Sequence, residues 1–368
     1  MKNLFLTLIA ISVATISAKA IKTTELKWHE ASNLPVLGTL APDASKEYSR
    51  LPDSLESQIR PDLWNLGKNS AGMSIRFRSD ATAIGMQWTA MNKFNMNHMT
   101  AAGIRGLDLY ALDDDGQWKT VSSARPLFHE KKTKTMVVTD MPRKMREYML
   151  YLPLYDGVDS IFIGTDSLAS VLPPAVDSPV KDKPVVVYGT SIVQGGCASR
   201  PGMVHTSILQ RRLNRDFINL GFSGNAKLDP EIARLIADND PSVIVLDPLP
   251  NCKKEELEER LFNFYQIIRE KHPATPILFV ESCVFPIMKW NTETNETITE
   301  KNNTLKRLYA QIAANDSNVY YFEGDKILSD REGTVDNYHL TDLGFTDFAN
   351  NLYPVLKELL DKSSESKY

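Results

Sequence analysis

The chain has 368 residues, of which 42% are hydrophobic and 24% are charged, and its formal net charge is −4. This composition excludes a disordered chain, and the length leaves room for two domains of ordinary size. The negative charge argues against nucleic acid as a partner, because nucleic-acid binding depends on clustered basic residues.

Residues 1–20 have the pattern of a secretory signal peptide. Lys2 supplies the positive start, residues 4–16 form an apolar centre, and Ala18-Lys19-Ala20 match an A-x-A cleavage site. The apolar run is too short to span a bilayer comfortably, which favours cleavage after Ala20 over a retained membrane anchor. No later stretch is apolar enough to cross a membrane. We therefore expect an exported protein, periplasmic or secreted, without a membrane span.

Residues 21–178 are expected to form an all-β domain together with a linker. Short apolar runs that alternate with polar residues are separated by turn signals, which is typical of an antiparallel, jelly-roll-like sandwich. The clearest runs are residues 72–78, 83–88, 107–112 and 160–164. Asp113-Asp114-Asp115-Gly116 is a hairpin signal. The proline-rich residues 172–179 are interpreted as the linker.

Residues 179–368 alternate between strand and helix patterns, which predicts an α/β domain with a parallel sheet. The expected strands are residues 185–188, 217–220, 243–246, 277–280 and 319–322, and the last expected helix covers residues 341–360. Helical spacing of apolar residues fills the intervals between these strands.

Ser191 follows the first of these strands, at the sheet edge where open α/β sheets hold their ligands. The surrounding stretch is not a G-x-S-x-G elbow, because Val193 stands where the second glycine belongs. It also lacks the G-K-[ST] ending of a phosphate-binding loop. A lone serine at a strand end is more often a turn or cap residue, so the rest of the chain must support a catalytic role.

Three further segments are predicted to reach the same edge of the sheet. They are residues 219–225, residues 249–251 and residues 335–344. Acyl transfer needs a nucleophile, a base, a group that orients the base, and donors to an oxyanion. Ser191 can be the nucleophile, and His339 can be the base. Asp336, three residues before His339, can orient it.

The oxyanion hole is predicted from two backbone groups and one side chain. The N–H groups of Ser191 and Gly224 and the side-chain amide of Asn251 are the candidate donors. Taken singly, Gly224 and Asn251 would be turn residues, and only their place beside the other segments suggests catalysis.

These segments resemble the four blocks of the SGNH (GDSL-type) hydrolase superfamily. Residues 189–202 match the opening motif of one subgroup, and residues 106–110 match the Gly-x-Asp-Leu-Tyr motif of its N-terminal sandwich domain. The resemblance implies a flavodoxin-like catalytic sheet and ester hydrolysis without a metal or other cofactor. Two blocks depart from the usual pattern, namely Asp-Pro-Leu-Pro-Asn at residues 247–251 and Tyr-His-Leu at residues 338–340.

Other residues have a structural and a functional interpretation. Arg200 is a candidate for binding a carboxylate or a sugar, and a salt bridge is an equal alternative. His98 lies in a loop, residues 91–99, that could reach over the active site. Asp108 and Tyr110 are expected to hold the first domain together.

The three cysteines, Cys197, Cys252 and Cys283, are interpreted as small buried residues. A Cys197–Cys252 disulfide is the alternative in an oxidising compartment. The sequence contains no C-x-x-C motif and no Cys/His cluster with zinc spacing, so no metal site is predicted.

The sequence therefore favours an exported serine esterase that deacetylates a carbohydrate. A lipid or thioester acylhydrolase is one alternative, and a non-catalytic glycan-binding protein on the same fold is another. Activity should fall at acidic pH as His339 becomes protonated, and chelators should not reduce it.

Overall fold

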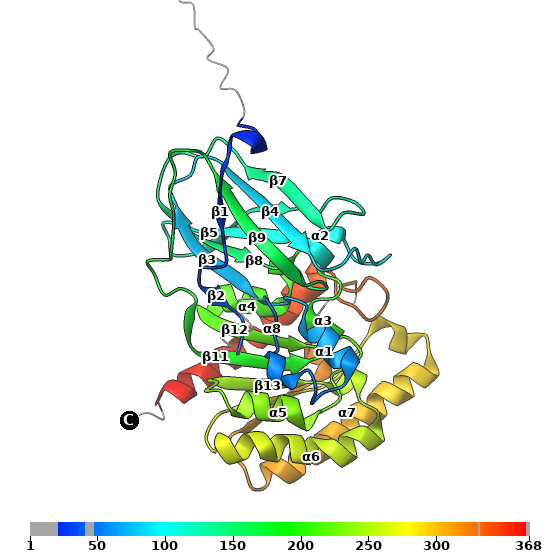
Figure 1. Ribbon diagram of the computed structural model, residues 1–368. Coiled ribbons are helices and arrows are strands. Elements are labelled where there is room, and N and C mark those ends of the chain that lie inside the picture. The colour runs from blue at the N-terminus through cyan, green and yellow to red at the C-terminus, as the bar shows by residue number, and fades with distance from the viewer. Residues whose placement is uncertain (1–20, 41–47, 330–331, 366–368) are drawn as a thin grey trace, which may run out of the picture.

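The computed structural model describes residues 21–40, 48–329 and 332–365. Two β-sheets form one part of the molecule, and a third sheet flanked by helices forms the other (Figure 1). The predicted signal peptide lies outside the described residues. Within the described ranges, no helix combines the length and the apolar character needed to span a bilayer.

The first part is an antiparallel β-sandwich, as the alternating pattern predicted. One sheet has the order β1 (Lys27–Glu30), β9 (Val158–Thr165), β4 (Ile84–Ala90), β7 (Lys132–Val138). The other has the order β10 (Val171–Leu172), β3 (Ser74–Ser79), β8 (Arg146–Tyr151), β5 (Leu107–Leu112), β6 (Trp118–Ala124), and β2 (Val36–Leu37) pairs with β3. Phe77, Trp88 and Leu150 are fully buried members of the shared core. The predicted hairpin joins β5 to β6, and its Gly116 has a positive φ of 72°.

The second part is a five-stranded parallel sheet with the flavodoxin-like order that the resemblance implied. Its order is β12 (Arg215–Gly221), β11 (Val180–Gly189), β13 (Val243–Asp247), β14 (Ile277–Val280), β15 (Val319–Phe322). Along β11, Val185 and Val187 point into one core, whereas Val186 and Tyr188 point into the other. This alternation buries both faces of the sheet, and it explains the continuous apolar runs in the sequence.

Helices cover both faces of the parallel sheet. The first face carries α3 (Ser191–Gln194), α4 (His205–Leu213) and α8 (Asp342–Glu365). The second carries α5 (Pro230–Ala237), α6 (Lys254–Lys271) and α7 (Thr292–Ala313). The carboxyl ends of the parallel strands form one edge of the sheet between these two layers of helices, where α/β folds of this kind hold their ligands.

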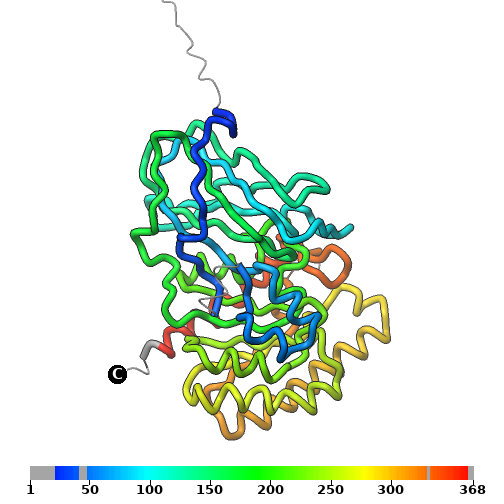
Figure 2. Tube along the Cα trace, in the orientation of Figure 1, coloured from blue at the N-terminus to red at the C-terminus, as the bar shows by residue number. Residues whose placement is uncertain are grey.

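One N-terminal segment packs against the parallel sheet. It contains the short 3-10 helix η3 (Asp53–Leu55) and α1 (Pro61–Gly67), and it lies beside the sheet in Figure 2. Leu63 and Trp64 belong to the same core as Val186. The sequence showed no strong helical period here, because a helix of seven residues is too short to display one and depends on tertiary packing.

Candidate active site

Ser191 stands where β11 turns sharply into α3. It is the first residue of α3, two positions after the strand ends at Gly189. A Cβ atom at position 189 would lie 2.4 Å from a methyl carbon of Val193 and 2.8 Å from the carbonyl oxygen of Asp247. Only glycine therefore permits this tight turn, which places the Ser191 hydroxyl at the carboxyl edge of the sheet.

His339 and Asp336 lie on the turn that leads into α8. The Nε2 atom of His339 is 2.9 Å from Oγ of Ser191, and its Nδ1 is 2.8 Å from Oδ2 of Asp336. The other carboxylate oxygen, Oδ1, accepts a hydrogen bond of 2.7 Å from the backbone N–H of His339. The structure thus brings the three residues predicted for acyl transfer into one hydrogen-bonded chain.

The Asp336 carboxylate is electrostatically suited to this position. Its partial burial acts to raise the pKa, but hydrogen bonds from the side chain and the backbone of His339 outweigh burial. The pKa of Asp336 is consequently below its ordinary value, so the group stays ionised and can stabilise a protonated imidazole.

The segment after Ser191 is tied to the segment that carries His339. The backbone N–H of Cys197 donates to the carbonyl oxygen of Leu340 at 2.9 Å. Nearby, the backbone N–H and hydroxyl of Ser199 both donate to the Asp342 carboxylate, at 2.8 and 2.5 Å. These bonds fix the distance between the hydroxyl and the imidazole through the backbone as well as through the side chains.

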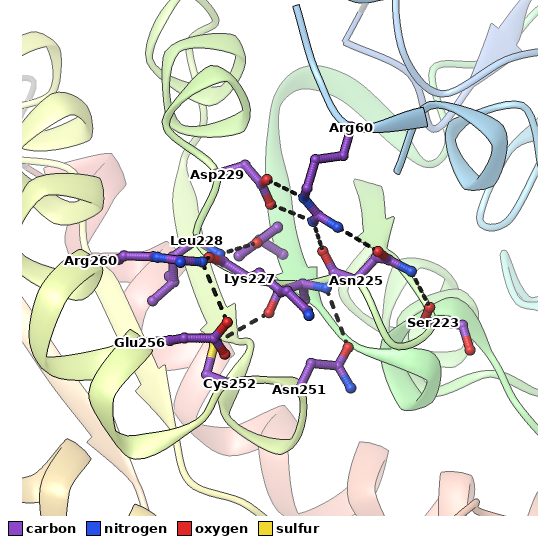
Figure 3. Close-up of polar contacts among 12 residues, drawn as sticks. Arg60, Ser223, Asn225, Lys227, Leu228, Asp229, Asn251, Cys252, Glu256 and Arg260 are labelled. Atoms are coloured by element: carbon purple, nitrogen blue, oxygen red, sulfur yellow. Dashed lines mark hydrogen bonds and ion pairs between the residues drawn. The ribbon is translucent and has the colours of Figure 1, made fainter. Parts of the chain in front are cut away.

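The predicted oxyanion donors lie on two neighbouring loops. Gly224 adopts a positive φ of 68°, which favours glycine, and Asn251 ends the 3-10 helix η5 (Leu249–Asn251). Oδ1 of Asn251 accepts a hydrogen bond of 3.3 Å from the backbone N–H of Ala226. In Figure 3 the amide nitrogen of Asn251 points away from the dashed line that its oxygen makes, so it can serve as a donor.

Arg60 braces the loop that carries Gly224. Its guanidinium holds both carboxylate oxygens of Asp229 at 2.8 and 2.9 Å, and it donates to the side-chain and backbone oxygens of Asn225 at 2.6 and 3.0 Å (Figure 3). On the other side of the loop, the buried Gln194 accepts a bond of 2.9 Å from the backbone N–H of Ser223. The loop is therefore held from two directions by side chains outside it.

A cavity of about 520 Å³ adjoins the hydroxyl of Ser191. Ser191, Asn251 and His339 line it together with residues of α7. The α7 residues are Glu293, Thr294, Thr297, Ile298 and Lys301. Burial lowers the pKa of Lys301, whose ammonium donates to the backbone oxygen of Pro250 at 3.2 Å, beside Asn251. The cavity thus combines hydrogen-bonding groups with apolar walls.

His98 reaches the site from the sandwich. Its ring centroid lies 5.7 Å from that of His339. The end of its loop is anchored, because the Thr100 hydroxyl donates to the carbonyl oxygen of Ser199 and Met99 is buried in the catalytic core. Ligand atoms of His98, His339 and Cys197 all lie within 4.8 Å of one another. The sequence predicted no set of metal ligands because these three residues are far apart along the chain.

Arg200 does not line the cavity. It forms an ion pair of 2.6 Å with Asp108, which is fully buried, and a bond of 2.6 Å with the hydroxyl of Tyr110. Asp108 also accepts a bond of 2.9 Å from the backbone N–H of Gly202. These contacts fit the ion-pair interpretation of Arg200, which joins the sandwich to the catalytic domain.

The cysteines do not form the disulfide that was considered. Cys197 and Cys252 are both free thiols and both buried. Burial, followed by the charge of Asp336, raises the pKa of Cys197 to about 12.

Arg60 and Lys301 were missed by sequence reasoning because nothing local distinguishes them. Gln194 was visible as part of the matched motif, but its role depends on the tertiary contact with Ser223.

Comparisons with known proteins identify the family of both parts of the chain. Residues 182–357 match the model of the GDSL-like lipase/acylhydrolase family, and residues 26–171 match that of the N-terminus of SGNH-hydrolase-type esterases. A search of curated proteins found no match.

Solved structures extend the likeness over both domains. A Bacteroides ovatus protein described as a GDSL-like lipase has 31% identity and a TM-score of 0.86, covering 91% of this chain and 98% of its own. A salicylyl-acyltransferase from a tetracycline biosynthetic pathway has 18% identity, a TM-score of 0.73 and the same coverage. A family two carbohydrate esterase from Cellvibrio japonicus, again with that coverage, has 12% identity and a TM-score of 0.60, and these two show the fold alone. The chain belongs to the GDSL-like lipase/acylhydrolase family and is an ester-bond hydrolase with the N-terminal domain of SGNH-type esterases.

Proposed function

We propose that this protein is an exported serine esterase that removes acetyl groups from a carbohydrate. The observation that carries the proposal is the hydrogen-bonded chain from Ser191 through His339 to Asp336, of which Ser191 and His339 line a cavity with polar groups on its wall. Export is inferred from the sequence of residues 1–20 alone.

The first half of the reaction transfers the acyl group to Ser191. As Oγ attacks the ester carbonyl, His339 takes its proton at Nε2, and Asp336 stabilises the imidazolium that forms. The bond to the leaving alcohol then breaks, and His339 returns the proton to that oxygen. In the second half, His339 activates a water molecule that attacks the acyl-enzyme and releases the acid.

The negative charge that develops on the carbonyl oxygen needs fixed donors. The N–H groups of Ser191 and Gly224 and the Asn251 amide nitrogen are assigned to this role. A preorganised donor of this kind contributes on the order of 3 kcal/mol to the transition state. Because Asn251 already bonds Ala226 through its oxygen, its nitrogen needs no reorientation when the charge appears.

The carbohydrate assignment rests on the shape and chemistry of the cavity. A volume of about 520 Å³ exceeds what an acetyl group needs, so part of the leaving alcohol would also be enclosed. Glu293, Thr294 and Thr297 offer hydrogen-bonding groups that suit sugar hydroxyls. Carbohydrate esterases also occur among the proteins that share this fold, although at 12–13% identity they support the fold only.

Acetate release from a panel of acetylated plant and bacterial polysaccharides tests the proposal. The chain from Ile21 onward is compared with its Ser191→Ala variant, and an aryl acetate serves as a general ester substrate. Acetate released only by the unsubstituted protein supports both the serine mechanism and the carbohydrate substrate. Hydrolysis of the aryl acetate without release from any polysaccharide contradicts the carbohydrate assignment and leaves the esterase.

A lipid or thioester acylhydrolase is the second candidate, favoured by the apolar groups of Ile192, Phe285 and Ile298 on the cavity wall. A series of acyl chain lengths on one alcohol separates the two. A maximum of kcat/KM at acetyl favours the carbohydrate esterase, and a maximum at long chains favours the alternative. Membership of a hydrolase family argues against a non-catalytic glycan-binding protein.

A further inference from the structure

Three residues with nitrogen and sulfur ligand atoms converge beside the reacting groups. His98 comes from the sandwich, Cys197 from the segment after α3, and His339 from the turn before α8. Their ligand atoms lie within 4.8 Å of one another. We propose that His98, Cys197 and His339 form an inhibitory binding site for a borderline-soft divalent cation such as Zn²⁺.

The ligand types select this class of cation. Two imidazoles and one thiolate are ligands that Zn²⁺ prefers, whereas Ca²⁺ and Mg²⁺ require oxygen ligands. Zinc bonds of about 2.0 Å to nitrogen and about 2.3 Å to sulfur place tetrahedral ligand atoms roughly 3.5 Å apart. Side-chain rotations that bring these atoms up to about 1.3 Å closer together would reach that spacing, and His98 is partly exposed. Water or the Ser191 hydroxyl supplies the fourth ligand.

Both histidines are already oriented as metal ligands usually are. A metal-binding histidine commonly donates its second ring N–H to a carboxylate or a carbonyl oxygen. Nδ1 of His98 faces Oδ1 of Asn97 at 2.9 Å, and Nδ1 of His339 faces Oδ2 of Asp336 at 2.8 Å. Each histidine therefore presents Nε2 for a metal.

The third ligand is held in place by the backbone. The N–H of Cys197 donates to the carbonyl oxygen of Leu340, the residue directly after His339, at 2.9 Å. Cys197 is 8% exposed, so its thiol lies within the protein next to the site and not on an open surface. On metal binding, the thiol proton leaves to solvent and the metal–sulfur bond replaces the S–H bond.

Binding would switch the enzyme off. Nε2 of His339 is the atom that faces Oγ of Ser191, so a metal at that nitrogen removes the group that accepts the serine proton. This inhibitory consequence rests on the proposed function, whereas metal binding itself does not. The proposed metal inhibits the enzyme and is not needed for catalysis, because the proposed reaction uses no metal. Removal of metal with a chelator should therefore leave activity unchanged or raise it.

Cobalt binding tests the site independently of turnover. Co²⁺ is titrated into the untagged chain from Ile21 onward carrying Ser191→Ala. We expect one equivalent to bind, with visible bands of tetrahedral cobalt and a thiolate-to-cobalt charge-transfer band in the near ultraviolet. Cys197→Ser should abolish the charge-transfer band, whereas Cys252→Ser, which changes another buried thiol, should retain it. Absence of the band from the Ser191→Ala protein, or its loss only in Cys252→Ser, overturns the site.

Zinc inhibition tests the consequence. Hydrolysis of an aryl acetate is measured against Zn²⁺ concentration for the protein without substitutions and for His98→Gln, each normalised to its own metal-free rate. We expect inhibition that EDTA reverses, and at least a tenfold higher half-inhibitory concentration for His98→Gln. This variant changes a partly exposed loop residue, so it keeps the test decisive if Cys197→Ser does not fold.

The two measurements separate failure of the site from failure of the proposed function. Hydrolysis with no cobalt band and no zinc inhibition overturns the site and leaves the esterase intact. A cobalt band that depends on Cys197, together with full activity in saturating zinc, shows a metal that leaves His339 free and overturns the three-residue site without contradicting the esterase.

Discussion

The two sides of the active site are held in different ways. On the reacting side, the His339 side chain bonds both Ser191 and Asp336, so the groups that react also hold one another in place. On the oxyanion side, the loop of Gly224 is positioned by residues that never touch the substrate, among them Arg60, which lies 165 positions from its partner Asn225. A change on the first side should therefore remove a chemical step, whereas a change behind the second should only misplace a donor.

Ser191→Ala is expected to have the largest effect. Loss of the hydroxyl removes the group that accepts the acyl chain, so kcat should fall on the order of 10⁴-fold or more. Steady-state hydrolysis of an aryl acetate measures this loss, and thermal unfolding should show an unchanged midpoint, because the side chain is small. Turnover within tenfold of the original would contradict the assignment of the nucleophile.

Asp336→Asn follows, with an expected loss of roughly 10⁴-fold in kcat, because an amide cannot stabilise the imidazolium and selects the wrong tautomer. Asp342→Asn is a matched control, since this neighbouring carboxylate bonds Ser199 and not His339. Its loss in the same assay should be much smaller. Equal losses for the two variants would indicate that the whole segment acts only as a structural support.

Asn251→Ala removes a proposed donor on the oxyanion side, and it should lower kcat by roughly 10²- to 10³-fold with little change in KM. The reason is that its amide nitrogen binds charge which exists only in the transition state. Asn251→Asp should be at least as damaging, because a carboxylate repels the developing oxyanion. A variant with raised KM and unchanged kcat would instead place Asn251 in substrate binding.

Arg60→Ala should lower kcat by about three- to tenfold, because the loop of Gly224 loses its brace but keeps the bond to Gln194. Arg60→Lys should recover only part of the activity, since lysine cannot reproduce the forked contact with Asp229. Arg234→Ala, which removes an exposed pair with Glu231, is the control and should change nothing. A loss equal to that of Asn251→Ala would contradict this, because the supporting residue would then matter as much as an oxyanion donor.

Arg200→Ala should have the smallest effect on turnover and a clear effect on stability. It leaves the buried Asp108 without its charged partner, which is expected to cost about 3 kcal/mol in the free energy of unfolding. Denaturant unfolding measures that cost, and kcat should stay within about twofold because no contact of Arg200 reaches the cavity. A large loss of kcat at unchanged stability would return Arg200 to the substrate site.

Short-range patterns in the sequence determined much of this protein. Alternating polarity indicated the sandwich, and continuous apolar runs indicated the parallel strands, because side-chain period follows directly from which faces are buried. The spacing of Asp336 and His339 indicated their contact, since a single turn joins them. Ser191, Gly224 and Asn251 were predicted to share one edge because each follows a predicted strand, and such ends meet at one edge of a parallel sheet.

Only the tertiary structure shows which distant residues support the loops at that edge and which face the reacting groups. Arg60 and His98 belong to the N-terminal half, and no local pattern signals that one braces the oxyanion loop while the other faces His339. The same holds for Arg200, because the sequence did not indicate which residue it would pair with, and the fold places Asp108 beside it. The physical reason is that these contacts join segments some 90 to 240 residues apart, and their geometry depends on how the two domains pack.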